Sequence, residues 1–581
     1  MLPKSLDPGP DRPPAGGEGG VRPVRVALEG AVRPGHEALL VRGDARPFAL
    51  VGEWAGGGAL VGSEPVRVAA AREDPFALLA ERAGDVAGEA PDRFVGGGWF
   101  GYLGFGLGTP GEAPVSQPPS RERLPGFSLA RYDHLLRLDR DGRWWFEALW
   151  TEDRAAALEE RLGILGGRLR EGAPAPGRFA TGPWRSDPSP GGHARAVQAC
   201  RERIAAGDLY QANVSLRLRS TLRGDPADLF ARAAGALRPD RAAYLADDRG
   251  AIASLSPELF LERRGGRVRS APIKGTRPRA GDGEAAAATR AELVGSEKDR
   301  AENTMIVDLV RNDLGRVCVP GSVTVTALAE ARPHPGVWHL VSEVEGELRP
   351  GVDDAELLAA TFPPGSVTGA PKLAAIEAIA ELESNARQAF TGAIGFASPC
   401  AGLELNVAIR TFEIRGERIW LDAGGGIVAD SDPEAEAAEA RVKARPLLEA
   451  IGASLGAGPS STSAPAVPRL GPRALPRPSP AAGVFETLRA SDGRPVELER
   501  HLARLRTSVS RLYGEDLPPG LGGRVLAAAA GTEGEARLRV EFTPGRGIEA
   551  TSAPLVGLAE PVVLAPVTVP GGLGPHKWRD R

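Results

Sequence analysis

One segment after residue 455 sets the first limit on how this chain can fold. Residues 456–482, GAGPSSTSAPAVPRLGPRALPRPSPAA, are rich in proline, serine, glycine and alanine and nearly lack large apolar side chains. Such a segment cannot bury enough apolar surface to fold, so we expect a semi-extended linker. The chain should therefore form separate folded bodies on either side of it, and its 581 residues suggest two to four domains.

Composition and the pattern of apolar residues divide the rest of the chain into four regions. Residues 1–23 have a high proline and glycine content and are expected to be a disordered N-terminus. Residues 24–180 alternate short apolar runs with turn residues, which predicts a β-rich region. Residues 190–455 alternate strand-like runs with helical stretches, which predicts a mixed α+β body. Residues 483–581 begin a new and different module, expected to be a small α/β domain.

Composition excludes several broad classes of protein. The formal net charge is -4, from 71 Lys+Arg against 75 Asp+Glu, which argues against a nucleic-acid binder. No apolar run approaches the ~18 residues of a transmembrane helix, and the N-terminus has no apolar region typical of a secretory signal. Cys200, Cys318 and Cys400 are scattered, so neither a disulfide framework nor a zinc site is expected. We therefore expect a cytoplasmic protein without membrane or nucleic-acid partners.

Two acidic helices are candidates for a site. In EKDRAENTMIVDLVRNDLG, Asp299 and Glu302 lie three residues apart and share one helix face. In DAGGGIVADSDPEAEAAEARVKA, Glu436 and Glu439 are spaced in the same way, with Lys443 four residues further on. Helix-supporting charge pairs would explain both patterns. Alternatively, carboxylates from the two helices converge on Mg²⁺, which prefers oxygen ligands.

Basic and glycine-rich stretches suggest where an anionic substrate would bind. Gly424, Gly425 and Gly426 leave the backbone open to close approach by an anion. Arg410 stands among apolar neighbours in ELNVAIRTFEI, where a cation is costly unless it meets an anion. Lys274, in RSAPIKGTRPR, is either a solvated surface cation or a nucleophile placed beside a flexible Gly-Thr pair.

Nine motifs, in both their residues and their order along the chain, resemble those of the chorismate-utilising enzyme family over roughly residues 24–452. The motifs are GDLYQANVSLRL, SLSPELFLE, APIKGTRPR, DRAENTMIVDLVRNDLGRV, HLVSEVEG, PPGSVTGAPK, TGAIGF, VAIRTFEI and GGGIVADSDPEAEAAEARVKA. The resemblance implies an α+β fold with a central β-sandwich and surrounding helices. It also implies that residues 190–455 form a catalytic domain that uses chorismate and Mg²⁺.

One position within these motifs separates the branches of the family. Anthranilate synthases usually carry alanine in PIAGTRPRG, whereas this chain has lysine in PIKGT, as in the branch that makes 4-amino-4-deoxychorismate. The resemblance thus implies a transaminase-type amidotransferase of 4-aminobenzoate and folate biosynthesis, in which Lys274 attacks ring C2 and ammonia adds at C4. Component I of anthranilate synthase and a non-catalytic member of the family are the alternatives.

The resemblance also assigns roles to individual residues. It implies Lys274 as nucleophile, Glu258 as general acid for the departing hydroxyl, and His339 facing the ring. The implied Mg²⁺ ligands are Glu302 and Glu439, with Glu436 acting through water. The residues expected to hold the substrate or order its pocket are Gly275, Thr276, Arg410, Gly424, Gly425, Gly426, Arg311 and Arg316.

A source of ammonia is expected outside this chain. None of the three cysteines lies in the G-x-C-x-G type of turn that carries a glutaminase nucleophile. We therefore expect a separate glutamine amidotransferase subunit, component II, as the partner that supplies ammonia.

The C-terminal module carries a second resemblance. GVFETLRASDGRPVELERHLARLRTSVSRL is similar to the start of fold-type IV pyridoxal-phosphate enzymes, which include aminodeoxychorismate lyase. This similarity implies Arg504 as the residue holding the cofactor phosphate and Lys577 as the Schiff-base lysine. The module would link amination to the elimination of pyruvate that gives 4-aminobenzoate. Because only four residues follow Lys577, we expect a truncated module, with a docking element or vestige as the alternative.

Overall fold

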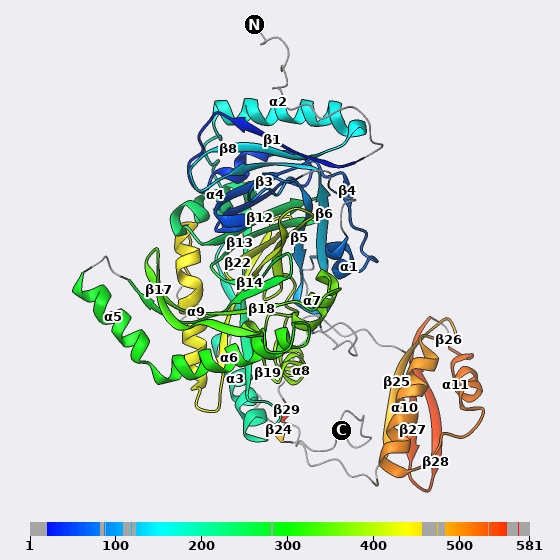
Figure 1. Cartoon of the computed structure of the whole chain (residues 1–581). Coiled ribbons are helices and arrows are strands. Elements are labelled where there is room, and N and C mark those ends of the chain that lie inside the picture. The colour runs from blue at the N-terminus through cyan, green and yellow to red at the C-terminus, as the bar shows by residue number, and fades with distance from the viewer. Residues whose placement is uncertain are drawn as a thin grey trace. The chain divides into compact units, whose positions relative to one another are not determined.

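The chain forms two compact units, Met1–Gly458 and Pro459–Arg581. A computed structural model describes residues 20–554, except 82–85, 87–88, 109–117, 119–123, 280–282, 456–472, 475–480, 482 and 533, together with residues 567–568. Most of the expected linker, nearly all of the expected disordered N-terminus, and Lys577 lie outside the described residues. Each unit is therefore considered by itself (Figure 1).

The first unit is built on two large antiparallel sheets (Figure 1). The 13-stranded sheet runs in the order β1 (Arg22–Leu28), β8 (Trp144–Trp150), β7 (His134–Leu138), β3 (Gly58–Gly62), β2 (Phe48–Gly52), β12 (Arg241–Asp247), β13 (Gly250–Ser256), β22 (Thr411–Arg415), β23 (Arg418–Ile427), β11 (Gln211–Arg223) and β10 (Arg185–Asp187). Two short strands, β9 (Ala180–Thr181) and β19 (Gly369–Ala370), also pair with β11.

The second sheet has ten strands. Its order is β16 (Ile273–Pro278), β18 (Val337–Glu347), β15 (Arg267–Ala271), β14 (Leu259–Arg264), β21 (Gly402–Val407), β20 (Ala393–Ser398), β5 (Gly98–Leu103), β6 (Phe127–Tyr132) and β4 (Arg67–Val68), and β17 (Thr324–His334) pairs with β18. Both sheets mix strands from the regions expected at 24–180 and 190–455: β2 pairs with β12, and β5 pairs with β20. The two regions are therefore parts of one body, not separate sheets.

The two sheets pack face to face around an aromatic core. Phe48 on the first sheet stacks on Phe100 of the second at a ring-centroid distance of 4.2 Å, and both rings contact Tyr132. All six residues of β5 are buried, because the strand lies inside its sheet with apolar side chains against both faces. This packing is the central β-sandwich, so the predicted α+β fold is confirmed.

Helices cover the outer faces of the sandwich (Figure 1). On the first sheet, α2 (Ala155–Glu171), α4 (Pro226–Leu237), α9 (Pro433–Ala450) and the 3-10 helix η1 (Glu37–Val41) share one apolar core with the strands, and α3 (Pro190–Ala205) and α8 (Lys372–Leu382) pack with β11 in another. On the second sheet lie α1 (Pro75–Ala80), α5 (Glu284–Gly295), α6 (Glu297–Gly315) and α7 (Asp354–Thr361). Four further 3-10 helices are η2 (Trp54–Gly56), η3 (Phe105–Leu107), η4 (Glu152–Arg154) and η5 (Gly365–Val367).

The second unit is a small α/β module, as the sequence predicts. Its four-stranded sheet has the order β26 (Arg494–Pro495), β25 (Val484–Ser491), β27 (Glu535–Thr543) and β28 (Gly547–Pro554), and two helices, α10 (Leu498–Tyr513) and α11 (Leu521–Ala529), pack on it. Leu502, Leu505 and Val509 recur at helical spacing on α10 and are buried against the sheet. A short parallel pair joins β24 (Arg473–Ala474) to β29 (Val567–Thr568). Among all described helices, none is both long and apolar enough to cross a membrane.

Candidate active site

Lys274 lies on β16 at a point where the strand is irregular. The pairing of β16 with β18 shifts register between Ile273 and Thr276. Gly275 adopts a positive φ of 83°, and a Cβ there would meet the Leu293 and Leu340 side chains at 3.1 Å. The positive φ therefore favours glycine at this position, and a Cβ would also require the two leucine side chains to shift slightly. Local shifts of register of this kind redirect a side chain, and here the affected side chain is that of Lys274.

The amine of Lys274 pairs with Glu302 of α6. The distance from Nζ to Oε1 is 2.9 Å, and the two side chains are 11% and 19% exposed. Gln211, at the start of β11, donates from Nε2 to the same carboxylate oxygen at 3.1 Å. Burial opposes ionisation of Glu302, but the Lys274 ammonium holds the pKa of this carboxyl below its ordinary value. Lys274 is therefore largely buried and paired, so the alternative of a solvated surface cation is wrong.

The second acidic helix, α9, begins beside the glycine triplet. Asp432 caps it by accepting a hydrogen bond from the backbone N–H of Ala435, and Pro433 occupies the first turn. Glu436 is buried and accepts a hydrogen bond of 2.8 Å from Ser431 Oγ, and burial raises the pKa of its carboxyl.

Lys443 accompanies these carboxylates on α9. Its Nζ lies 2.9 Å from Glu439 Oε1 and donates to the carbonyl of Gly424 at 3.1 Å. Burial opposes ionisation of Glu439, but Lys443 holds the pKa of that carboxyl below its ordinary value. Lys443 and Lys298 also act electrostatically on Glu302, so the acidic side chains of α6 and α9 share one neighbourhood.

Glycine residues on β23 make room for these acidic side chains. A Cβ on Gly426 would lie 2.2 Å from Gln211 Nε2 and 2.6 Å from Glu302 Oε1, and one on Gly425 would lie 3.1 Å from Glu436 Oε2. Neither glycine has a positive φ, so space and not backbone conformation requires them. All three glycines pair with β11 in the first sheet. Gly425 and Gly426 thus let side chains of the chain itself approach the strand, whereas a Cβ on Gly424 would collide with the backbone of β11 at Val214.

The donor set of this region fits a hard cation such as Mg²⁺. The described residues contain no group of three or more His, Cys, Asp or Glu already gathered as a metal centre. The side chains that converge nevertheless offer carboxylate oxygens, which Mg²⁺ prefers. In addition, the Oε1 atom of Gln211, next to Glu302, is buried without a hydrogen-bond partner. An unpartnered buried oxygen beside a carboxylate suits a cation or one of its water ligands.

Glu258 is a buried carboxyl close to Lys274. It lies between β13 and β14 and is 3% exposed. The N–H of Ile273 and the hydroxyl of Ser366 both donate to it, the latter at 2.6 Å to Oε1. Burial raises the pKa of Glu258 to about 7, so a large fraction keeps its proton at neutral pH. A carboxyl that holds a proton at neutral pH can act as a general acid.

His339 on β18 is neutral. Burial, followed by the charges of Arg410 and His334, lowers its pKa to about 2. Its Nδ1 lies 2.9 Å from Thr276 Oγ1, so the two predicted pocket residues are joined directly. The imidazole therefore offers a hydrogen-bonding edge without a charge.

Arg410 directly precedes β22 in a left-handed conformation, with φ of 52°. Burial lowers the pKa of its guanidinium, while Glu258 and Asp240 oppose that change. Within the described part of the chain, the guanidinium has no ion-pair partner. A non-glycine residue with positive φ is uncommon, and such strain is often found where a side chain meets a ligand.

Two predicted arginines do not join this cluster. Arg311 extends from α6 into solvent, is 52% exposed and pairs with Asp308 at 2.9 Å. Arg316 follows α6 and donates to the carbonyl of Ala360 at 3.3 Å. Because a helix rises 1.5 Å per residue, Arg311 is about 13 Å along α6 from Glu302. The described contacts therefore place neither arginine beside Lys274 or Glu302, and their role in the pocket stays a prediction.

Sequence reasoning missed Ser366. Its hydroxyl is the side-chain partner of Glu258, although it lies far away in sequence, in the PPGSVTGAPK loop. Glycine and proline in the loop ahead of a helix indicate a loop with a defined conformation. Nothing in the sequence position of the serine indicates a contact with Glu258.

The C-terminal unit does not present a free phosphate-binding arginine. Arg504 donates to both carboxylate oxygens of Glu486 at 2.6 Å, and His501 lies 3.1 Å from the same carboxylate. A phosphate at this position would face the buried Glu486 carboxylate and compete with it for Arg504. The described residues of this unit therefore do not fit a pyridoxal-phosphate site, and Lys577 lies outside them.

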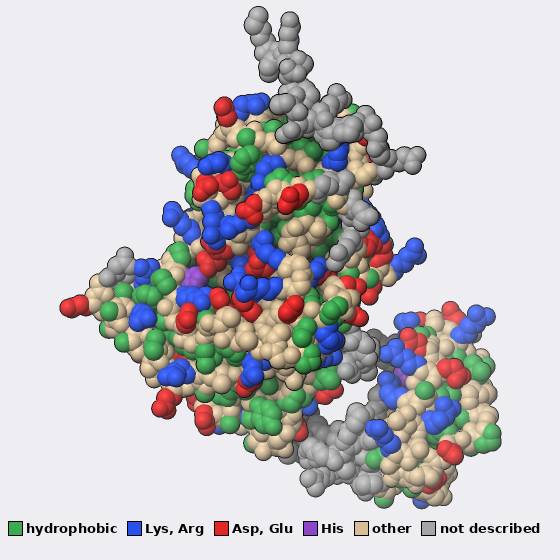
Figure 2. Space-filling model, in the orientation of Figure 1, with side chains coloured by type: hydrophobic (Ala, Val, Ile, Leu, Met, Phe, Trp, Pro, Cys, Tyr) green, Lys and Arg blue, Asp and Glu red, His purple; other side chains and the backbone are tan. Residues whose placement is uncertain are grey.

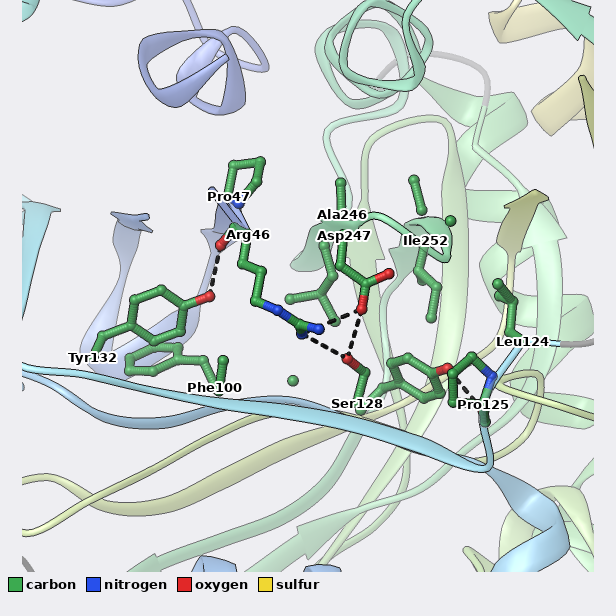
Figure 3. A pocket seen from close by; sticks show the side chains of 16 residues that line it. Arg46, Pro47, Phe100, Leu124, Pro125, Ser128, Tyr132, Ala246, Asp247 and Ile252 are labelled. Atoms are coloured by element: carbon green, nitrogen blue, oxygen red, sulfur yellow. Dashed lines mark hydrogen bonds and ion pairs between the residues drawn. The ribbon is translucent and has the colours of Figure 1, made fainter. Parts of the chain in front are cut away.

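A separate small cavity lies between the two sheets (Figure 3). Its volume is about 30 Å³, and Arg46, Ser128 and Asp247 form a hydrogen-bonded triangle at its edge. The Tyr132 hydroxyl donates to the carbonyl of Arg46 at 2.6 Å. This space holds about one water molecule, and the polar groups at its edge satisfy one another.

In the described part of the chain, an α+β fold thus brings a paired lysine, a carboxyl with a raised pKa and an arginine without an ion-pair partner within electrostatic reach of one another, beside an acidic cluster. The chain belongs to the family of chorismate binding enzymes, which matches residues 58–449. The resemblance found in the nine motifs is thereby confirmed.

Relatives from both branches are similar to this chain. It is 39% identical over 356 residues to "Aminodeoxychorismate synthase component 1" of Klebsiella aerogenes, covering 61% of this chain and 77% of the relative. It is 36% identical over 417 residues to "Anthranilate synthase component 1" of Streptomyces coelicolor, covering 67% and 80%. Among solved structures, anthranilate synthase component I of Streptococcus pneumoniae TIGR4 matches with a TM-score of 0.58 and 27% identity, over 73% of this chain and 92% of that one.

Proposed function

We propose that this chain aminates chorismate at ring carbon C4 and so produces 4-amino-4-deoxychorismate for 4-aminobenzoate and folate biosynthesis. The observation that carries the proposal is the setting of Lys274. Its amine lies 2.9 Å from Glu302, and its neighbour Ile273 hydrogen-bonds the buried acid Glu258. A nucleophile and a general acid are thus available side by side, as a substitution at the ring requires.

The reaction proceeds in two balanced steps. The unprotonated amine of Lys274 forms a bond to C2, both ring double bonds shift by one position towards C4, and the C4–O bond breaks. Glu258 gives its proton to the departing hydroxyl, which leaves as water. Ammonia then adds at C4, the two double bonds shift back, and the C2–N bond to Lys274 breaks, which releases the neutral amine; one proton of the new C4 ammonium group returns to Glu258.

The remaining pocket residues bind and orient the substrate. Arg410, which has no ion-pair partner among the residues that the structure describes, holds one carboxylate of chorismate, and Thr276 and the N–H of Gly275 assist. Neutral His339 faces the ring and, because it carries no charge, does not compete with Glu258 as the acid.

Glu302 and Glu439 are the proposed direct ligands of Mg²⁺, with Glu436 acting through water. When bound, the metal supplies positive charge for a substrate carboxylate.

Ammonia is proposed to come from a separate glutamine amidotransferase subunit. The cysteines of this chain are poorly suited to attack glutamine, since burial raises the pKa of Cys200 and Cys400 to about 11 and also raises that of Cys318. A thiol with a raised pKa holds little of the nucleophilic thiolate at neutral pH.

Product analysis tests this function. Purified chain is incubated with chorismate, Mg²⁺ and ammonia, with and without a glutaminase subunit, and the products are separated by chromatography. We expect 4-amino-4-deoxychorismate, and at least about 100-fold slower formation by Lys274→Ala. Arg140→Ala is the control, because Arg140 is a 60% exposed cation whose carboxylate partner, Glu53 at 3.3 Å, is not a residue of the proposed site. Anthranilate as the main product, or undiminished turnover by Lys274→Ala, contradicts the proposal.

A further inference from the structure

A buried arginine outside the proposed pocket hydrogen-bonds two backbone segments, each of which supports one of the proposed reacting groups. Arg387 follows α8 and has a side chain that is 1% exposed. Its guanidinium forms a bidentate pair with Glu383, with Nε donating to Oε2 at 2.9 Å. Its other N–H groups donate to the carbonyls of Val367 and Asn213 and to the Thr391 hydroxyl. All five donors of the guanidinium thus have acceptors.

The two carbonyls belong to the segments that support the reacting groups. Val367 adjoins Ser366, whose hydroxyl donates to the proposed acid Glu258. Asn213 lies two residues beyond Gln211, whose amide donates to Glu302, the partner of Lys274.

The segments also meet directly where Arg387 binds. The N–H of Asn213 donates to the carbonyl of Thr368 at 2.8 Å. Glu383 strengthens this junction, because its Oε1 accepts from both the N–H and the hydroxyl of Ser215. The Arg387–Glu383 pair is thus bonded to both segments at the point where they touch.

We infer that Arg387 is a positioning residue that fixes the distance between the general-acid side and the nucleophile side of the pocket. This inference rests on the proposed function. One rigid, planar group with fixed donor directions binds the backbone on both sides, so neither segment can move without breaking a buried charge-assisted hydrogen bond. Because a small misplacement of reacting groups costs a large factor in rate, Arg387 should influence turnover without touching substrate.

Lysine cannot replace arginine in this role. Arg387→Lys keeps the positive charge beside Glu383, so no buried carboxylate is left without a counter-ion. It has three donors in place of five and cannot bridge both carbonyls in one plane. Arg263→Lys is the matched control, since Arg263 forms a bidentate pair with buried Asp354 and binds neither segment.

Two measurements test the inference on the full chain. The first is kcat against pH, corrected for the folded fraction. We expect Arg387→Lys to lower kcat about 10- to 100-fold, whereas Arg263→Lys stays within about 2-fold of the wild type. Loss of the Ser366 hydrogen bond should also raise the pKa of Glu258, so the alkaline limb of the kcat profile should move to higher pH. Reduced folding alone lowers amplitude but does not move this limb.

The second measurement is backbone hydrogen exchange by mass spectrometry, which needs no turnover. Residues 211–215 and 365–368 should exchange faster together in Arg387→Lys and unchanged in Arg263→Lys. If Arg387→Lys does not fold, the double variant Glu383→Leu/Arg387→Met replaces it, since a buried ion pair can be exchanged for apolar side chains without leaving a lone charge.

The outcomes separate the inference from the function on which it rests. An unchanged kcat per folded molecule, an unmoved alkaline limb, or faster exchange in only one segment overturns the role of Arg387. A wild-type chain that does not aminate chorismate refutes the proposed function instead, and hydrogen exchange then decides alone whether Arg387 holds the two segments together.

Discussion

Replacing Glu258 by glutamine should stabilise the fold at alkaline pH while abolishing most activity. Glu258 is 3% exposed, and burial raises its pKa from an ordinary 4.5 to about 7. The folded state therefore binds this proton more tightly than the unfolded state. The stability that the protonated carboxyl contributes is complete below about pH 4.5 and is lost as the pH rises through about 7. Glutamine keeps the shape of the side chain and carries no charge at any pH.

The magnitude follows from the change in proton affinity. With about 1.4 kcal/mol for each tenfold change, wild type should lose about 2–3 kcal/mol of unfolding free energy from this group between pH 5 and pH 8. Glu258→Gln should not lose it. Other titrating groups affect both proteins equally, so the difference between the two pH dependences isolates Glu258.

Urea unfolding followed by tryptophan fluorescence measures this difference. Of the nine tryptophans, all but Trp578 lie in the first unit, so the signal reports mainly on the unit that contains Glu258. The same variant should lower kcat by about 100- to 10,000-fold, as expected for loss of a general acid.

Glu413→Gln is the matched control. Glu413 is also buried, burial also raises its pKa to about 7, and its carboxylate accepts from the N–H groups of Ala389 and Phe390, outside the pocket. It should alter the pH dependence of stability in the same direction and leave kcat nearly unchanged. Identical pH dependences for wild type and Glu258→Gln would refute the reasoning, as would a Glu258→Gln enzyme with wild-type kcat.

Four further substitutions probe the site and the C-terminal unit. Gly426→Ala should abolish high-affinity Mg²⁺ binding in calorimetry because its Cβ would collide with the acidic cluster, whereas Gly295→Ala, with open space around it, should bind as wild type does. Arg410→Lys should raise KM for chorismate about 10-fold or more in steady-state kinetics through loss of a bidentate contact, and an unchanged KM would contradict that contact. His339→Gln should leave both limbs of the pH–rate profile in place, since the wild-type imidazole is already neutral above about pH 2. Arg504→Ala should lower the unfolding free energy of the second unit by about 1–3 kcal/mol by removing two charge-assisted hydrogen bonds from the buried Glu486 carboxylate, which thermal unfolding of the full chain will detect.

The charge pattern of the surface agrees with one conclusion drawn from composition. Over the face seen in Figure 2, Lys and Arg side chains are interspersed with Asp and Glu. This mixture accords with the near balance of 71 basic and 75 acidic residues and with the expectation of a small-molecule substrate.

Local chemistry in the sequence determined much of the site. Lys274 beside Gly275, the two acidic helices, and Arg410 on an apolar strand could each be recognised because helix spacing, glycine conformation and the cost of an isolated cation are short-range properties. The family was recognisable for a related reason: its motifs are contiguous stretches that retain their order.

Only the tertiary structure decided which of these groups meet. The pairing of Lys274 with Glu302, the hydrogen bond from Ser366 to Glu258, and the contacts of Arg387 join residues far apart in the chain. Only the tertiary structure also shows that strands from residues 24–180 and 190–455 alternate in both sheets. Antiparallel pairing between distant strands does not change the local periodicity of the sequence.

The clearest limit of the sequence is seen at the glycine triplet and at Arg311. Both carry the right residue types for binding an anion. In the structure, Gly425 and Gly426 leave room for the chain's own carboxylates, and Arg311 lies in solvent, so their contact with an anion stays a prediction. Residue type therefore indicated the chemistry available to this protein, whereas the direction of each side chain, which depends on long-range packing, decided where that chemistry can act.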